Sequence, residues 1–196
     1  MDFYDLPTPA VLVDKHRLIA NIEKMQRAAT AAGIRLRPHA KTHKSVTIAQ
    51  YQINAGAVGI TVATVGEAEV FANHGIPNIR IAYPLPISVS ERIIALMSNT
   101  QISIVVDNAI IAKHWSELMV NANCRLDVLV KVDVGFNRCG INPQQPEAVK
   151  FISEIDNLPG LRLCGLLSHA GQAYDASTYQ DIRDIARREA DMLRAL

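Results

Sequence analysis

Residues 59–84 read GITVATVGEAEVFANHGIPNIRIAYP and contain a complete strand–helix–strand unit. Gly59–Thr64 is rich in β-branched side chains, which favours a strand. Val65–His74 is predicted to be a helix, and Gly75 is the glycine that commonly ends one. Asn78–Tyr83 is predicted to be the second strand. Two strands joined by a helix are typical of a parallel sheet.

The same alternation continues on both sides of this unit. Before it, the sequence predicts a strand at Ala10–Asp14, whose last residue is also the N-cap of the next helix. That helix has Leu18, Ile22, Met25 and Ala29 at helical spacing and ends at Gly33. A strand at Arg35–Lys41, weakened by Pro38, and a helix at Val46–Ala55 follow. After it, the predicted strands are Ile102–Asp107, Leu126–Asp133 and Leu161–Ser168, and the predicted helices are Ala109–Val120 capped by Asn108, Pro146–Ile155, and Asp175 onward. Ser88 and Glu91 form a capping-box pattern before the helix that contains Ile94 and Met97.

Several predicted strands are nearly continuous runs of Val, Ile and Leu, as is typical of parallel strands buried on both faces. The alternating order fits both a doubly wound sheet and a TIM barrel. Polar residues that follow the strand ends favour the barrel, because a barrel gathers its functional groups at that end: His39, Lys41, Thr64, Tyr83, Asp107, Asn137, Arg138, Ser168 and His169. Polar loops after strands are also common without any function. The expected fold is therefore of the α/β class, a (β/α)8 TIM-type barrel.

A complete barrel has eight strands and typically about 250 residues. The chain has 196 residues, and its predicted strands after the opening segment Ala10–Asp14 supply about six of the eight. We therefore expect residues 1–196 to form one barrel domain that is incomplete within this chain.

Composition excludes several classes of function. The chain has 20 Lys and Arg against 19 Asp and Glu, a net charge of +1, so no broad basic surface suggests nucleic acid as a partner. No apolar run reaches the roughly 20 residues that span a bilayer, and the N-terminus MDFYD does not resemble a secretory signal. The three cysteines form no CxxC pair. We expect a cytoplasmic protein without a membrane or nucleic-acid partner.

Three segments carry residues suited to chemistry. Arg37–Lys44 is rich in cationic and titratable side chains, and a lysine desolvated there could act as a nucleophile, although an ordinary basic loop is the simpler interpretation. Lys131–Gly140 presents Arg138 in a loop flanked by glycines, where it could bind an anionic oxygen or form a surface salt bridge. His169 ends a predicted strand, and it could stack on a planar ligand or hydrogen bond to a carbonyl within the core. The acidic residues of GEAE at 66–69 are better interpreted as the first turn of a helix.

Taken together, these segments resemble a known family. The motifs PHAKTHK (38–44), GITVATVGEAE (59–69), IAYP (81–84), VKVDVGFNRCG (130–140) and GLLSHAG (165–171) are similar, in order and spacing, to the D-threonine aldolase and D-serine dehydratase group. That group belongs to the pyridoxal-phosphate enzymes with an alanine-racemase-type N-terminal barrel. The resemblance runs from about Asp5 to the C-terminus and covers about the N-terminal half of a typical member.

The resemblance implies a role for individual residues. Lys41 matches the lysine that attaches covalently to pyridoxal 5'-phosphate and is the expected catalytic residue. Arg138 matches the arginine at the cofactor's phenolic oxygen, and His169 matches the histidine stacked on the pyridine ring. His39, Thr64 and Ser168 are expected to contact the cofactor at the same end of the barrel, where the strands end. Lys131 falls where some racemases carry a structural lysine near that arginine.

The same resemblance implies an activity and partners. The expected function is a lyase of the D-threonine aldolase type acting on D-β-hydroxy amino acids. The alternatives are a D-serine dehydratase, an amino-acid racemase and a non-catalytic cofactor-binding protein. Family members add a C-terminal β-domain with a divalent-metal site, so no metal is expected within this barrel domain. An amino-acid substrate and a homodimer are the expected partners.

Overall fold

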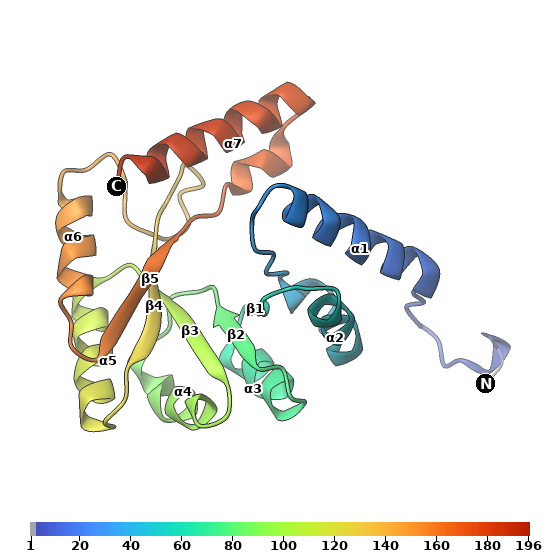
Figure 1. The fold of residues 1–196 in the computed structure, drawn as a ribbon, viewed down its shortest axis with the longest axis horizontal. Helices are drawn as coiled ribbons and strands as arrows, with labels where there is room; N and C mark the ends of the chain where they lie inside the picture. The colour runs from blue at the N-terminus through green and yellow to red at the C-terminus, as the bar shows by residue number, and fades with distance from the viewer. Residues whose placement is uncertain (1–2) are drawn as a thin grey trace.

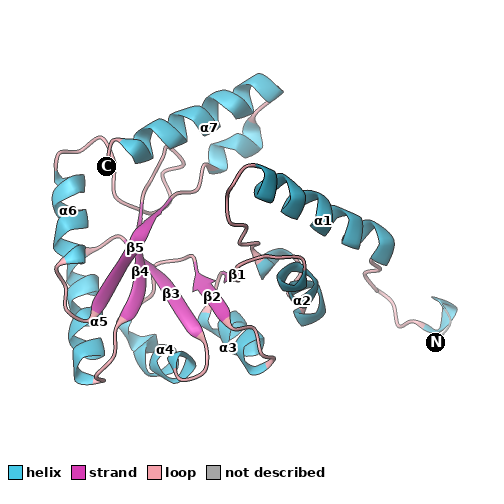
Figure 2. Ribbon diagram, viewed as in Figure 1, coloured by secondary structure: helices cyan, strands magenta, loops and turns pink. Residues whose placement is uncertain are grey.

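The computed structural model describes residues 3–196 and contains one parallel sheet with helices around it (Figures 1 and 2). The strands are β1 (Ile60–Val62), β2 (Asn78–Ile81), β3 (Gln101–Val106), β4 (Leu126–Lys131) and β5 (Leu161–Leu167). The helices are α1 (Lys15–Ala31), α2 (Val46–Asn54), α3 (Val65–Asn73), α4 (Ser90–Met97), α5 (Ala109–Asn121), α6 (Glu147–Asp156) and α7 (Tyr179–Arg194). Short 3-10 turns lie at Phe3–Asp5, Ala40–Thr42, Ile87–Val89 and Gly171–Asp175.

The strand order decides between the two architectures that the sequence left open. The strands lie in the order β1-β2-β3-β4-β5, all parallel, so each strand pairs with the next one along the chain. A doubly wound sheet reverses its order at a switch point, and this sheet does not. Right-handed crossovers without a reversal place all the connecting helices on the same side of the sheet, as in a TIM barrel. The prediction of an α/β fold of the TIM-barrel type is therefore confirmed for the five strands of the described residues.

The two predicted strands before β1 are not strands in the structure. Ala10–Asp14 is irregular, with Val11 94% exposed, because no neighbouring strand pairs with it within residues 3–196. Arg35–Lys41 forms only an isolated bridge between His39 and Thr61. Pro38 lacks an N–H, and its carbonyl accepts a single 2.7 Å hydrogen bond from the Thr61 N–H. Both predictions were wrong, since a strand requires a pairing partner as well as suitable residues.

Helix caps were predicted with mixed success. The Asp14 side chain accepts the Arg17 N–H at 3.0 Å, and Asn108 caps α5, as expected. The capping box at Ser88 is wrong: the 3-10 turn Ile87–Val89 continues into α4, which begins at Ser90 without a side-chain cap. The last helix begins at Tyr179 rather than Asp175, because Thr178 supplies its capping box.

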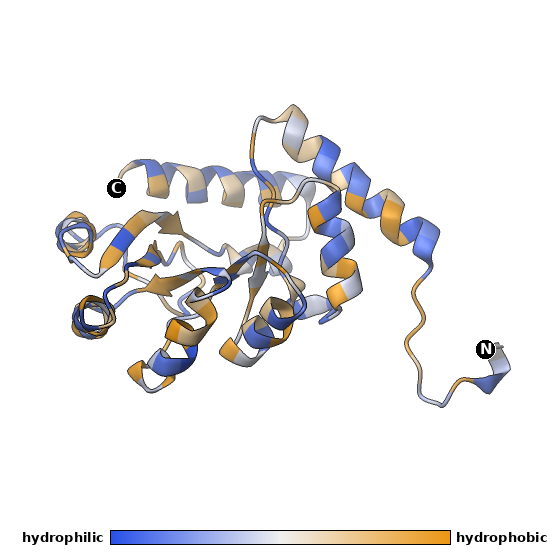
Figure 3. Ribbon diagram, turned by 60° about the horizontal axis from the view of Figure 1, so that its bottom comes forward, coloured by the Kyte–Doolittle hydropathy of each residue, from blue (hydrophilic) through white to orange (hydrophobic). Residues whose placement is uncertain are grey.

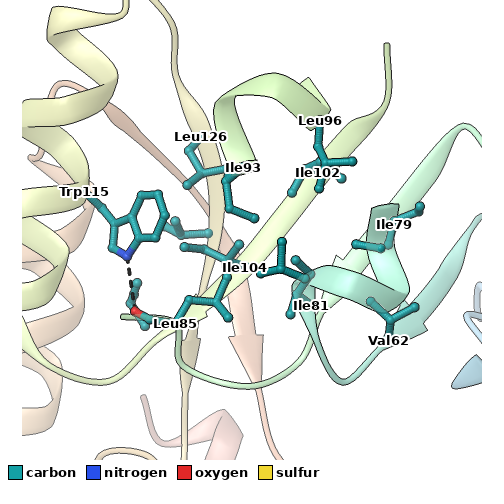
Figure 4. Packing of buried hydrophobic residues seen from close by; sticks show 14 of the residues in the cluster. Val62, Ile79, Ile81, Leu85, Ile93, Leu96, Ile102, Ile104, Trp115 and Leu126 are labelled. Atoms are coloured by element: carbon teal, nitrogen blue, oxygen red, sulfur yellow. Dashed lines mark hydrogen bonds between the residues drawn. The ribbon is translucent and has the colours of Figure 1, made fainter. Parts of the chain in front are cut away.

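The outward face of the sheet forms the core with the helices. Alternate strand residues such as Ile79, Ile81 and Ile104 are fully buried there, and the indole N–H of Trp115 donates a 3.4 Å hydrogen bond to the Leu85 carbonyl (Figure 4). The inward face is polar at one register level, where five residues align across the strands: Thr61, Arg80, Ser103, Asp127 and Arg162. At this level of the sheet, the strands are therefore apolar on the outward face and polar on the inward face. Their composition had suggested apolar residues on both faces.

The first and last helices contribute little to this core, although Met192 and Leu193 of α7 pack against it. Hydrophobic and hydrophilic residues alternate along α1 and α7, as expected for amphipathic helices (Figure 3). Ala29 is the buried residue of α1, and Ile185 is that of α7. Within residues 3–196, no helix combines the length and the apolar character that a membrane span needs.

Candidate functional site

The carboxyl ends of the strands surround a cavity of about 490 Å³. Its lining comes from segments that are far apart in the sequence: Arg37, His39, Lys41, Thr42, Thr61, Ala63, Ala82, Tyr83, Lys131, Arg138, Leu167, Ser168, His169 and Tyr174. Parallel strands end at the same edge, which is where barrel enzymes place their chemistry. A cavity of about 680 Å³ between α1 and α2 lies away from these strand ends and has neither lysine nor histidine in its lining.

Lys41 lies in a backbone turn that its neighbours hold in place. It is the middle residue of the 3-10 turn Ala40–Thr42, and Ala40 is fully buried. The Lys41 N–H donates to His39 Nδ1 at 3.3 Å, and the Thr42 hydroxyl donates to the His39 carbonyl at 3.3 Å. Lys44 ends the turn with a positive φ of 49° and pairs with Glu67 at 3.1 Å. This segment is therefore more ordered than a simple basic loop.

Arg138 is presented by a loop that Asp133 organises. The Asp133 Oδ1 accepts hydrogen bonds from three backbone N–H groups, those of Gly135, Phe136 and Asn137, at 2.9–3.0 Å. The guanidinium of Arg138 lies 5.5 Å from the centre of the Phe136 ring. Within residues 3–196, no carboxylate pairs with Arg138 within 4.0 Å. The structure therefore does not support the alternative of a surface salt bridge.

The far end of the same loop is fixed to the sheet. The Gly140 N–H donates to Asp107 Oδ2 at 3.0 Å, and Gly140 has a φ of +115°. A Cβ at this position would lie 2.7 Å from the Asp133 nitrogen. The backbone therefore requires glycine here, which explains one of the two glycines that flank the loop.

His169 lies against two aromatic rings. Its imidazole meets Phe136 edge to face with ring centres 5.5 Å apart, and Tyr174 lies at 5.9 Å. Burial, followed by the charges of Arg138, Lys131 and Lys41, lowers the pKa of His169 below its usual 6.5. The imidazole is therefore neutral at neutral pH. His169 is half-buried, and its ring contacts in the described residues are with aromatic rings rather than with a core carbonyl.

Lys131 lies beneath the mouth of the cavity. It is 2% exposed, and its ammonium donates to the Leu167 carbonyl at 3.4 Å. Burial lowers the pKa of Lys131, and the charge of Arg138 lowers it further, against the opposing effect of Cys139. The lining contains Lys41, Lys131 and Arg138 but neither Asp nor Glu. The cavity therefore suits a ligand that carries negative charge.

Two of the predicted cofactor contacts have other partners in the structure. The Thr64 hydroxyl accepts the Glu67 N–H at 3.1 Å and caps α3, and Thr64 does not line the cavity. Ser168 lines the cavity, and its hydroxyl donates a 2.5 Å hydrogen bond to Glu189 of α7. Glu67 lies in the first turn of α3, as predicted, and accepts the Ala63 N–H at 2.7 Å. Glu69 lies beyond the first turn and accepts two hydrogen bonds of 2.7 Å from Arg92.

Thr61, Tyr83 and Tyr174 are among the lining residues for which the sequence predicted no site role. Thr61 faces inward by strand alternation, and the period-two pattern of β1 was the signal that could have found it. Tyr83 was noted only as a polar strand end. Tyr174 comes from the turn Gly171–Asp175, whose path no local pattern predicts. In residues 3–196, no group of three His, Cys, Asp or Glu side chains is placed to hold a metal ion.

Comparison with known proteins agrees with this geometry. Residues 13–195 match the family model of the alanine racemase N-terminal domain. The chain is 33% identical to D-threo-3-hydroxyaspartate dehydratase of Delftia sp. strain HT23, over 94% of this chain and 49% of that protein. It is 34% identical to D-threonine aldolase of Arthrobacter sp., over 93% of this chain and 48% of that protein.

Comparison with solved structures identifies the same group of relatives. D-threonine aldolase from Filomicrobium marinum superposes with a TM-score of 0.91 at 33% identity, covering 97% of this chain and 52% of that one. The chain thus spans about half the length of these relatives. With most of its residues matched by one family model, the chain belongs to the family of the alanine racemase N-terminal domain, and its homologues include a D-threonine aldolase and a D-threo-3-hydroxyaspartate dehydratase.

Proposed function

We propose that this chain forms the cofactor-binding part of a pyridoxal-phosphate-dependent lyase of the D-threonine aldolase type, acting on D-β-hydroxy amino acids. One observation carries the proposal: Lys41, Arg138 and His169, from three segments distant in sequence, line a single cavity at the strand ends. The names of the homologues, an aldolase and a dehydratase of 3-hydroxy amino acids, support the substrate class.

The residues present fit pyridoxal phosphate. The cofactor has an aldehyde that reacts with a lysine amine, a flat aromatic ring and an anionic phosphate. The cavity offers Lys41, the flat imidazole of His169 and a lining with cations but without carboxylates. When bound, the cofactor supplies an electron sink that stabilises negative charge at the substrate α-carbon.

The chain's own groups would divide the work. Lys41 would hold the cofactor covalently and afterwards carry a proton to or from the substrate α-carbon. Arg138, without a carboxylate partner in the described residues, would bind the phenolic oxygen. His169 would pack against the ring, and its lowered pKa keeps it from adding a further positive charge. His39 would act through the backbone of Lys41, whose N–H it accepts.

Cofactor attachment is the first test. The purified chain is mixed with pyridoxal phosphate, reduced with borohydride, digested and analysed by mass spectrometry. We expect the added mass on Lys41 and its loss in Lys41→Ala. Lys150→Ala is the matched control, since Lys150 lies on the exposed surface of α6 with its side chain 78% exposed. Equal labelling of Lys41→Ala and the unmodified chain would contradict the proposal.

The products then identify the reaction. An aldolase releases glycine and acetaldehyde from D-threonine, whereas a dehydratase releases pyruvate from D-serine. Loss of optical purity without either product indicates a racemase. Labelling of Lys41 with none of these reactions indicates a protein that binds the cofactor without catalysis, which is the alternative from another class.

The assembly is a further part of the proposal. Following the family resemblance, we propose that residues 1–196 are an N-terminal barrel domain, that a divalent metal belongs to a C-terminal β-domain, and that the protein is a homodimer. Light scattering of the protein that carries both domains gives its mass in solution. A monomer over the full concentration range would contradict the dimer.

A further inference from the structure

A second cavity lies on the inward face of the sheet, towards the amino ends of the strands. It has a volume of about 440 Å³, and charged and polar side chains make up most of its lining: Arg35, Arg37, Val58, Asn78, Arg80, Gln101, Ser103, Asp127, Arg162 and Cys164. Of these residues only Arg37 also lines the cavity that contains Lys41. The proposed function therefore assigns no role to this part of the sheet.

The lining carries more positive than negative charge. Its four arginines face a single carboxylate, that of Asp127. Arg162 binds this carboxylate with two hydrogen bonds of 2.6 and 2.8 Å, and Gln101 donates a third at 3.3 Å. Asp127 is thus fully engaged by Arg162 and Gln101. Within residues 3–196 its carboxylate forms no ion pair with the other three arginines, although its charge raises the pKa of Arg80 against the larger effect of burial.

Arg37 and Arg80 form no ion pair in the described part of the chain. Arg37 Nη1 donates to the Ile60 and Asn78 carbonyls at 3.3 and 3.5 Å, and Arg80 Nε donates to the Ser103 hydroxyl at 3.2 Å. Within residues 3–196, Nη2 of Arg37 and both terminal nitrogens of Arg80 have no protein acceptor. Arg37 and Arg80 both line the cavity.

Electrostatics agrees with this arrangement. Burial, followed by the neighbouring charges of Arg80 and Arg35, lowers the pKa of Arg37 to about 10. The pKa of Arg80 is also lowered, mainly by burial. Two half-buried guanidinium groups that repel each other are stabilised when an anion lies between them.

We propose that the inward face of the sheet binds an oxyanion, a phosphate or carboxylate group, between Arg37 and Arg80. Such a group offers two or more acceptor oxygens to the free N–H groups of the two arginines, the pairing that guanidinium geometry favours. The engaged Asp127–Arg162 pair forms one wall of the site, and the Ser103 hydroxyl fixes the orientation of Arg80. The site is separate from the proposed lyase site except for Arg37, which lines both cavities.

The test is calorimetric titration of the chain with inorganic phosphate, and separately with malonate. The cavity that contains Lys41 could also bind phosphate. The titration is therefore done with an Arg138→Gln variant, in which phosphate binding to that cavity is weakened. Adding Arg80→Gln is expected to weaken phosphate binding by about tenfold or more. Arg27→Gln is the matched control, because Arg27 lies on the exposed face of α1, away from the cavity, and forms an ion pair with Glu23.

A second variant changes affinity in the opposite direction. Asp127→Asn removes the one negative charge of the lining and is expected to tighten phosphate binding several-fold. If Arg80 had only a structural role, this substitution would not increase the affinity for phosphate. Tighter binding of malonate than phosphate identifies a carboxylate ligand, and the reverse identifies a phosphate. The proposal would be overturned if Arg80→Gln and Asp127→Asn both left the affinities for phosphate and malonate within twofold of those of the Arg138→Gln parent.

Discussion

The imidazole of His169 and the ring of Phe136 meet edge to face, with their centres 5.5 Å apart and an angle of 90° between their planes. Gly171 makes this contact possible, because a Cβ at that position would lie 2.7 Å from three atoms of the Phe136 ring. The guanidinium of Arg138 rests on the same ring. Two of the proposed cofactor-binding residues therefore share one aromatic support.

Replacing Gly171 by alanine is expected to displace Phe136 and with it both His169 and Arg138. We expect Gly171→Ala to weaken pyridoxal-phosphate binding by about tenfold, since positioning within a fraction of an ångström decides such sites. The measurement is a titration followed by cofactor absorbance. The double variant Gly171→Ala with Phe136→Leu removes the clash and should recover part of the affinity. Unchanged binding in the single variant would show that Phe136 does not position the site.

Local sequence patterns predicted the elements whose neighbours are also in the sheet. Gly59–Thr64 and Ile102–Asp107 contain β1 and most of β3, whereas the equally apolar Ala10–Asp14 is irregular. The difference is the presence of a pairing strand, which composition does not encode. The polar inward layer was also missed, although Arg80 and Asp127 alternate with apolar residues in β2 and β4.

The candidate site was predicted in part. Family motifs singled out Lys41, Arg138 and His169, and the structure brings all three to one cavity. The contact of Phe136 with Gly171 could not be predicted, because it depends on how two loops after different strands fold against each other. Short-range patterns hold no information on such contacts.

Gly160 is expected to be intolerant of any side chain. Its N–H donates to the Ser116 hydroxyl at 3.0 Å, and a Cβ would lie 2.1 Å from the Ser116 carbonyl oxygen. Gly160→Ala should therefore lower the free energy of unfolding by about 1–3 kcal/mol, the usual cost of overpacking. Urea unfolding followed by circular dichroism measures this change.

A matched glycine gives the control for that experiment. Gly66 lies in the first turn of α3, and a Cβ there would approach nothing closer than the Arg92 side chain at 3.9 Å. Gly66→Ala should stabilise the protein by about 0.4–1 kcal/mol, because alanine has less freedom to lose on folding. Equal effects of the two substitutions would contradict the packing account of Gly160.

Glu189 is expected to influence the titration of His169. Its carboxylate accepts the Ser168 hydroxyl at 2.5 Å, and its negative charge raises the pKa of His169 against the larger lowering effects of burial and of Arg138, Lys131 and Lys41. Glu189→Gln should therefore lower the pKa of His169 further. NMR titration of the histidine ring protons measures it. The control is Glu154→Gln on the exposed surface of α6, where the carboxylate pairs with Lys150. A His169 pKa that rises in Glu189→Gln would contradict this assignment.

Stability is expected to fall as the pH is lowered from 7.5 to 5.5, a range in which most carboxylates stay ionised. Burial is the first cause that lowers the pKa of His39, His43 and His169 below the usual 6.5 in the folded chain. Below pH 6.5 the unfolded chain binds protons that the folded chain does not, so the free energy of unfolding decreases as the pH falls towards the folded-state pKa values. Above pH 6.5 the contribution is fully present.

His43 allows this linkage to be tested outside the cofactor cavity. Its Nδ1 accepts the Ser45 N–H at 3.0 Å, and it does not line that cavity. His43→Gln removes one of the three linked groups, so the loss of stability between pH 7.5 and 5.5 should be smaller than in the unmodified chain, whatever the substitution does at a single pH. Urea unfolding of both proteins at the two pH values gives the comparison. An equal loss of stability in the variant would show that His43 is already protonated or exposed in the folded chain, and that the dependence comes from His39 and His169.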